Sequence, residues 1–342
     1  MIDLIKYKKI PFVISSVLFV VSLILIFTIG LRPGIDFTGG SLMEVTFSNE
    51  RPSIGQVKES LSQLDLELGE PVIQPTGEKG MIIRVQYMGE DEHQQVLGNL
   101  RNSFETSASV ESSLMEIEGV EIQEVLEAEV VGETGIVEEQ VQVVEENKVW
   151  EERIETIGPA ISAHLKSRAI YAVIAVVLAI VAYVAYAFRK VSRPVKSWKY
   201  GISAVVALVH DVTLTMGIFV LLGKYLNVEI GIPFVVALLT ILGYSVNDSI
   251  VVFDRVRENL IKRTADKFAE MVNLGVNQTF IRSINTSVTT LTVLFALFLF
   301  GGESIKYFAL ALIVGIASGT YSSIFLASPL LVVWEELTHR RK

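Results

Sequence analysis

The sequence contains no cysteine and only four histidines in 342 residues. Without a thiol, the chain cannot form disulfide bonds, thiolate nucleophiles or cysteine-ligated metal sites. The histidines are scattered along the chain, so a histidine metal site is not expected either. The sequence also shows no nucleotide-binding loop and no paired nucleophile and base. These absences predict a protein that is not an enzyme and that carries no cofactor or metal.

Charged residues are missing from long stretches of the chain, and 51% of all residues are hydrophobic. Uncharged or nearly uncharged runs of about 18 residues or more predict membrane-spanning helices. Six such runs occur, at residues 11–31, 169–188, 201–223, 230–253, 283–302 and 307–334. The third run is interrupted only by His210 and Asp211, and the fourth only by Asp248. We therefore predict a multi-pass α-helical membrane protein with six spans.

The net charge of −9 is divided unevenly along the chain. Residues 34–165 contain 27 acidic and 7 basic residues, which gives −20, whereas the remainder contains 11 and 22, which gives +11. The basic residues cluster at the N-terminus and after the second, fourth and sixth apolar runs. Because short loops rich in Lys and Arg are retained in the cytoplasm, we predict that both termini are cytoplasmic. The acidic segment then lies outside, in the periplasm.

The apolar runs divide the chain into four predicted parts. These are a first membrane helix at residues 1–31, an outer domain at 32–166, a bundle of five membrane helices at 167–334 and a cytoplasmic tail at 335–342. The outer domain shows a β-α-β-β-α-β pattern, with strands at residues 42–47, 72–74, 81–87 and 153–157 and helices at 52–64 and 90–104. This order is typical of a ferredoxin-like α+β domain. Residues 107–150 fit it least, and we interpret them as an acidic insertion.

Asp248 lies inside the fourth apolar run and is the first candidate for function. An ionisable group at membrane depth costs roughly 2.5–3.5 kcal/mol on insertion scales. One interpretation is a titratable carboxylate in the interior of the helix bundle, with Ser245 one turn back on its face and Asn247 beside it in sequence. The other is an aspartate near the membrane surface that is satisfied by water and neighbouring amides.

Arg282 is the predicted partner of Asp248, because it stands at the start of the fifth apolar run and cannot be deprotonated in practice. It could hold Asp248 ionised and lose this pairing when a proton arrives. Alternatively, it anchors the helix at the membrane surface as a snorkelling cation. Asn285, Thr286 and Thr289 share its helix face, so we do not expect this face to meet lipid.

His210 and Asp211 lie near the middle of the third run. Such a pair inside a membrane helix either relays protons or forms a structural link between the third and fourth spans. Because the sequence shows no partner for the pair, we favour the structural link.

Three further patterns concern local structure. Residues 315–319 in the sixth run form a GxxxG pattern, which predicts close contact with another helix. Residues 264–279, between the fourth and fifth runs, carry a weak apolar stripe that predicts a short helix at the membrane surface. Residues 34–40 contain three glycines and are interpreted as a shaped turn that leads into the first strand.

Four motifs occur in order along the chain: residues 34–40 (GIDFTGG), 209–212 (VHDV), 243–259 (GYSVNDSIVVFDRVREN) and 282–290 (RSINTSVTT). Together they resemble the SecF family, the smaller subunit of the SecDF protein-export complex in the RND superfamily. The resemblance implies an RND-type half with six transmembrane helices in the bacterial cytoplasmic membrane. It further implies an accessory role in protein export that uses the proton gradient, or sodium in some relatives. The family's carboxylate matches Asp248, and its essential arginine matches Arg282.

The resemblance also implies a set of partners. These are a SecD-type subunit that supplies a further aspartate, the SecYEG translocon, the translocating polypeptide, a YidC-type insertase and a YajC-type accessory protein. Nucleic acid is not among them. Two alternatives stay open at this point. The chain could be half of an RND-type small-molecule exporter, or a membrane scaffold that uses no gradient and in which Asp248 is structural.

Overall fold

The computed structural model describes residues 3–105, 147–187 and 197–339. Contacts within the chain divide it into two compact units. A helical unit comprises Met1–Thr38 and Pro159–Lys342, and a sheet unit comprises Gly39–Gly158. Of the acidic insertion expected at residues 107–150, all but the last four residues lie outside the described part of the chain.

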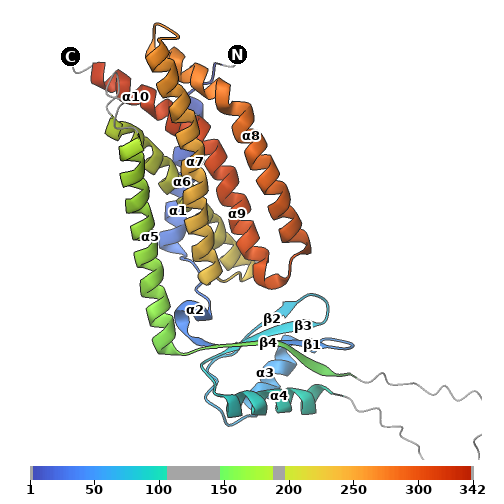
Figure 1. Ribbon diagram of the computed structural model, residues 1–342. Coiled ribbons are helices and arrows are strands. Elements are labelled where there is room, and N and C mark those ends of the chain that lie inside the picture. Colours follow the sequence, from blue (N-terminus) through green and yellow to red (C-terminus); the bar gives the residue numbers. More distant parts are fainter. Residues whose placement is uncertain (1–2, 106–146, 188–196, 340–342) are drawn as a thin grey trace, which may run out of the picture. The chain divides into compact units, whose positions relative to one another are not determined.

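In the described part of the chain, the sheet unit is a four-stranded antiparallel sheet with helices on one face (Figure 1). Its elements in chain order are β1 (Gly40–Phe47), α3 (Ile54–Ser62), β2 (Val72–Thr76), β3 (Gly80–Val85), α4 (Glu90–Phe104) and β4 (Val149–Ile157). The strands lie in the order β2-β3-β1-β4. This topology confirms the predicted ferredoxin-like α+β domain.

Alternation along the central strand β1 builds the core of the sheet unit. Met43, Val45 and Phe47 are completely buried, as expected for every second residue of a strand whose one face is covered. α3 begins with a capping box, in which the side chains of Ser53 and Gln56 each accept a hydrogen bond from the other residue's backbone N–H. Local sequence and core pattern therefore specify the same arrangement.

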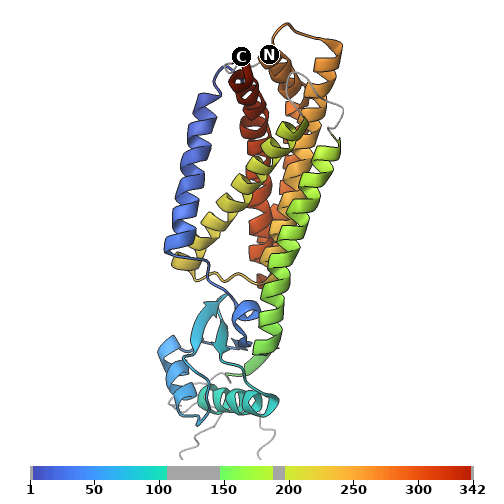
Figure 2. The ribbon, with the colours of Figure 1, turned by 90° about the vertical axis from the view of Figure 1, so that its left-hand side faces the viewer.

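Among the described residues, the helical unit contains six helices that are long and apolar enough to cross a membrane. They are α1 (Lys9–Thr28), α5 (Pro159–Ala187), α6 (Ser197–Leu226), α7 (Ile232–Lys262), α8 (Phe268–Phe300) and a last span made of α9 (Glu303–Ser322), the π-helix η1 (Ser323–Ala327) and α10 (Ser328–His339). α1 begins and α10 ends at the same end of this bundle (Figures 1 and 2). The prediction of six spans is confirmed.

The structure corrects the sequence prediction in two helices. The described residues 264–279 do not form a separate surface helix, because α8 begins at Phe268 and continues without a break to Phe300. Arg282 therefore lies about four turns inside α8 and not at its start. The sixth span is not a uniform α-helix, since η1 separates α9 from α10. Hydropathy marks only the part of a helix that meets lipid, so it misses both extensions and local changes of helix type.

The glycine-rich segment after α1 is a shaped turn, as predicted. It forms the helical turn α2 (Ile35–Thr38) and then passes through Gly39 and Gly40 with φ of +75° and +128°. The Asp36 carboxylate accepts a hydrogen bond of 2.6 Å from the backbone N–H of Ile232 in the first turn of α7. Asp36 thereby caps α7, a role that the sequence pattern did not indicate.

α9 packs closely on α7, as the GxxxG pattern predicts. A Cβ atom added at Gly315 would lie 2.2 Å from the Ile241 side chain, and one added at Gly319 would lie 2.9 Å from Ser245. Neither position can carry a side chain without moving the helices apart. This close approach brings hydroxyl groups of α9 within reach of polar groups on α6 and α7.

Candidate ion-relay site

Two aspartates are buried among the membrane-length helices. Asp211 on α6 is completely buried, and Asp248 on α7 is 7% exposed. A buried carboxylate is stable in surroundings of low polarity only when other groups satisfy its charge and its oxygens. The groups that do so differ between the two aspartates, and this difference separates their roles.

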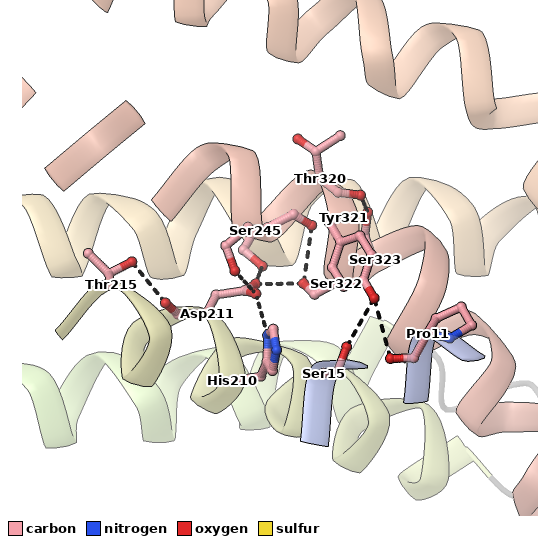
Figure 3. Close-up of polar contacts among 12 residues, drawn as sticks. Pro11, Ser15, His210, Asp211, Thr215, Ser245, Thr320, Tyr321, Ser322 and Ser323 are labelled. Carbon is pink, nitrogen blue, oxygen red and sulfur yellow. Dashed lines mark hydrogen bonds and ion pairs between the residues drawn. The ribbon is translucent and has the colours of Figure 1, made fainter. Parts of the chain in front are cut away.

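Asp211 accepts four hydrogen bonds. Its Oδ1 accepts one from His210 Nδ1 at 3.1 Å and one from the Ser318 hydroxyl at 2.8 Å. Its Oδ2 accepts bonds from Ser245 at 2.7 Å and Ser322 at 2.6 Å (Figure 3). Ser245 belongs to α7, whereas the other two serines belong to α9. Asp211 therefore ties the third span to both the fourth and the sixth.

Asp248 accepts only two side-chain hydrogen bonds within the described residues. The Ser283 hydroxyl of α8 donates to Oδ1 at 3.0 Å, and the Ser323 hydroxyl donates to Oδ2 at 3.3 Å. Ser323 is the first residue of η1. Its hydroxyl also lies 3.0 Å from the carbonyl oxygen of Thr320, so it divides its bonding between two acceptors.

The two carboxylates differ in their capacity to take up a proton. An ionised carboxylate offers about four acceptor positions on its two oxygens. Donors occupy all four at Asp211, which leaves no position for a proton unless a donor is displaced. Two positions remain open at Asp248. On this geometry, Asp248 is the aspartate that can change its charge, and Asp211 is the one built to keep it.

Arg282 stands next to Ser283 on α8, and its side chain is exposed in this chain. Its positive charge acts on the Asp248 carboxylate through space. Within the described residues, however, Arg282 forms no ion pair within 4.0 Å. The direct pair between Arg282 and Asp248 that the sequence predicts is therefore not made in this structure, and hydroxyl groups hold the carboxylate instead.

Three other candidates from the sequence have different surroundings. Ser245 lies one turn from Asp248 on α7, but its hydroxyl donates to Asp211. Asn247 and Asn285 are both exposed in this chain and reach neither carboxylate through a hydrogen bond within the described residues. The structure thus brings Ser245 into the buried network and leaves the two asparagines on the surface of the helical unit.

His210 is buried between α6 and α1. Its ring stacks on Phe19 of α1, with the ring centroids 6.5 Å apart. Nδ1 contacts Asp211, whereas Nε2 has no hydrogen-bond partner in the described part of the chain. In those same residues, no group of three side chains from His, Cys, Asp and Glu is arranged to hold a metal ion.

Sequence reasoning missed most of the serines that hold the carboxylates. The missed donors are Ser283, Ser318, Ser322 and Ser323. A serine in a membrane helix commonly satisfies itself on the carbonyl of the preceding turn, so its presence alone does not indicate a site. The available signal was Gly319, because a close helix contact beside hydroxyl residues allows those hydroxyls to reach across.

Six membrane-length helices with two carboxylates buried among them, together with a ferredoxin-like unit, define a multi-pass membrane protein with a polar centre. Comparison with known families agrees with this class. Residues 136–337 match the family described as "Protein export membrane protein SecD/SecF, C-terminal". Residues 24–50, which include the glycine-rich turn, match the family described as "SecD/SecF GG Motif".

Full-length relatives give the same result. The protein translocase subunit SecF of Thermobaculum terrenum is 38% identical over 342 residues, covering 98% of this chain and 94% of the relative. SecF of Rhodothermus marinus is 36% identical over 334 residues, covering 96% and 91%. SecF of Haemophilus influenzae is 33% identical over 326 residues, covering 95% and 83%. The chain therefore belongs to the SecD/SecF family of protein-export membrane proteins, and these relatives are its SecF subunits.

Two solved structures are also similar to this chain. The crystal structure of SecDF from Thermus thermophilus, titled a translocon-associated membrane protein, has a TM-score of 0.75 at 29% identity. A structure of SecDF in a super-membrane-facing form has a TM-score of 0.59 at the same identity. Each comparison covers 98% of this chain but only 39% of the SecDF chain.

Proposed function

We propose that this chain is the SecF-type accessory subunit of a protein translocase and uses an ion gradient to promote the export of secretory proteins. One observation carries the coupling to the gradient. Asp248 is a carboxylate buried in a membrane helix with only two acceptor positions filled. The relatives named protein translocase subunit SecF support the role in export. Protons are the expected coupling ion, and sodium is the alternative.

The proposed coupling begins with a change of charge at Asp248. While ionised, the carboxylate attracts Arg282 and holds the hydroxyls of α8 and η1. A proton arriving from outside neutralises the carboxylate and removes this attraction. Moving one charge through 100 mV is worth about 2.3 kcal/mol, which shifts a two-state equilibrium roughly 50-fold. The helices around Asp248 then change their packing, and the outer domain follows.

Differences between the solved relatives support such a movement. The two SecDF structures match this chain with the same identity and the same coverage. Their TM-scores nevertheless differ, at 0.75 and 0.59. Chains equally related in sequence therefore adopt different conformations, as a coupling mechanism with two states requires.

A SecD-type subunit is the proposed direct partner. α8 carries a group of polar residues that are wholly or partly exposed in this chain: Arg282, Asn285, Thr286, Thr289 and Thr290. Polar groups left facing lipid are costly, so a partner helix would stabilise this surface. The chain spans 39% of the SecDF chain, and the remainder of that chain is long enough to hold such a partner.

We further propose a location in the bacterial cytoplasmic membrane, with both termini in the cytoplasm and the sheet unit outside. The charge of −20 on residues 34–165 and the common end of α1 and α10 support this orientation. The SecYEG translocon and the translocating polypeptide are the proposed further partners, since the similar SecDF is titled translocon-associated. A YidC-type insertase and a YajC-type accessory protein complete the proposed assembly.

The test is gradient-stimulated export into vesicles that hold this chain, a SecD-type chain and the SecYEG translocon. Asp248→Asn preserves the shape of the side chain but cannot ionise, so we expect the stimulation to be lost. Co-purification with the SecD-type chain in mild detergent should be unchanged. Asp254→Asn is the matched control, because it removes a half-exposed carboxylate from the end of the same helix. Its stimulation should equal that of the parent.

Two results would contradict the proposal. Export by Asp248→Asn at the parent rate, with the same dependence on the gradient, would show that Asp248 does not couple the ion. Purification of a functional, ion-coupled monomer or homodimer that needs no SecD-type chain would remove the proposed partner.

A further inference from the structure

Four consecutive hydroxyl side chains at the junction of α9 and η1 reach four different helices, and we call them the hydroxyl quartet: Thr320, Tyr321, Ser322 and Ser323. The first shares a hydrogen bond with Ser287 of α8, and the second accepts one from Ser15 of α1. The third donates to Asp211 of α6, and the fourth donates to Asp248 of α7. Figure 3 shows the quartet beside the bonds of Asp211.

The quartet is possible because successive side chains of a helix point about 100° apart. A helix surrounded on all sides can therefore address a different neighbour with each residue of one turn. All four quartet residues are buried or nearly so, with Ser322 and Ser323 completely buried. The last span is thus the axis around which the other helices of the polar centre are connected.

The regular α-helix ends within the quartet. η1 begins at Ser323, directly after the residue that binds Asp211. The Ser328 hydroxyl donates to the Ser323 carbonyl oxygen at 2.8 Å, so this backbone acceptor is bonded within the π-helical segment. Short π-helical segments inside α-helices often occur at functional sites. Here the change of helix type coincides with the step from one aspartate to the other.

The two serines of this step have unequal partners. Ser322 binds Asp211, whose acceptor positions are all filled, and it anchors the end of α9. Ser323 binds Asp248, which has positions open for a proton. A hydrogen bond to an ionised carboxylate is roughly twice as strong as one between neutral groups, so it weakens when Asp248 is protonated. Ser323 then keeps the Thr320 carbonyl as its acceptor, and no buried hydroxyl is left unsatisfied.

The charged surroundings of Asp248 contain no competing element on the last span. Arg282 acts from α8, and Asp211 with His210 lies one turn away on the other side of Ser245. Residues 307–334 in α9, η1 and α10 carry no charge, and neither do residues 169–187 in α5. A change of charge at Asp248 can therefore reach the last span only through the hydroxyl of Ser323 or through packing.

We propose that Ser323 is a positioning residue of the ion relay, and that its hydroxyl ties η1 to the charge state of Asp248. Uptake of a proton releases η1, and α10 repacks about the turn that Asp211 holds. This inference rests on the proposed function of Asp248. It adds to that function the element of this chain that moves first.

The first experiment measures the pH dependence of gradient-stimulated export in the assembled complex. Ser323→Ala removes one donor from the ionised carboxylate, so proton uptake becomes easier and the midpoint of the profile rises by about one pH unit. Ser323→Thr keeps the hydroxyl and should restore the parent midpoint. Ser287→Ala is the matched control, because it removes a buried serine hydroxyl that contacts the quartet but not Asp248.

The second experiment measures the distance between spin labels on cysteines introduced at Ile261 of α7 and Leu337 of α10, both of which are exposed. The natural chain has no cysteine, so the labels attach only at these sites. Asp248→Asn mimics the protonated state and should shift the distance distribution. Ser323→Ala should produce the same shift without any change at Asp248, whereas Ser287→Ala should leave the parent distribution unchanged.

The outcomes separate this inference from the proposed function. If Asp248→Asn abolishes gradient-stimulated export but Ser323→Ala keeps the parent midpoint and distances, the role of Ser323 is refuted and the proposed function stands. Equal effects of Ser287→Ala and Ser323→Ala would also refute it, because they would indicate a general loosening of the bundle. If Asp248→Asn keeps the stimulation, the proposed function itself fails.

Discussion

Asp211 and Asp248 should contribute very differently to the stability of the helical unit, although both are buried aspartates on neighbouring helices. The perturbation that exposes this difference is the same substitution, Asp→Ala, at each position. Both variants remove one buried charge and leave a cavity of similar size. These two terms largely cancel in the comparison, so the remaining difference comes from the hydrogen-bond donors that each variant leaves without an acceptor.

At Asp211, the substitution strands four donors. Ser322 has a second acceptor, the Gly319 carbonyl at 3.2 Å, which leaves three donors without a partner. At Asp248, the substitution strands two donors, of which Ser323 has the Thr320 carbonyl as its second acceptor. One donor is left there. The difference is therefore two unsatisfied donors.

Each unsatisfied buried donor costs about 1–3 kcal/mol. Serine hydroxyls can turn partly towards their own helix backbone, so the lower end of that range applies. We therefore expect Asp211→Ala to lower the free energy of unfolding by roughly 2 kcal/mol more than Asp248→Ala does, about a 30-fold difference in the unfolding equilibrium.

The assay is unfolding of the purified full-length chain in mixed micelles with increasing denaturing detergent, followed by loss of helical circular dichroism. Asp254→Ala serves as the control for loss of a carboxylate at a half-exposed position of α7. The reasoning is refuted if the two buried variants lose equal stability, or if Asp248→Ala loses more. Either result would mean that the number of donors does not distinguish the two aspartates.

Two further predictions concern packing and orientation. Gly319→Ala should destabilise the helical unit by about 1–3 kcal/mol, because its Cβ would collide with Ser245, whereas Gly243→Ala has open space around it and should not; the same unfolding assay decides, and equal stabilities would refute the close contact. In spheroplasts, Tyr87→Cys in the sheet unit should react with an impermeant thiol reagent and Thr264→Cys between α7 and α8 should not, since the chain has no other cysteine; the reverse pattern would overturn the proposed orientation.

The sequence was sufficient to predict the two units and most of their elements. Membrane helices must be apolar over their full width, so uncharged runs locate them without knowledge of their neighbours. The sheet unit follows from local patterns, and the predicted helix at residues 90–104 coincides with α4. The limits of α8 were predicted wrongly, because its first turns carry polar residues and extend beyond the apolar run. Apolarity reports the surroundings of a helix, not its length.

The candidate site could be predicted only in part. An aspartate in an apolar run is conspicuous because of its cost, and this identified Asp248 and Asp211. Their partners are distant in sequence: Ser283 lies 35 residues from Asp248, and Ser322 lies 111 residues from Asp211. Which serines meet which carboxylate depends on how the helices cross and rotate. A single sequence does not contain that information in its local pattern.

The π-helix η1 shows why the last span can respond to so small a change. A π-helical turn holds about one residue more than an α-helical turn, so η1 alters the phase of every residue that follows. With this phase, Ser323 reaches Asp248 while Leu331 and Val332 of α10 are buried to within 1% of their surface. π-helical geometry is itself rare, so these contacts at its two ends have to maintain it. Weakening the contact at Ser323 removes one of the two supports, and α10 is the segment whose packing then changes.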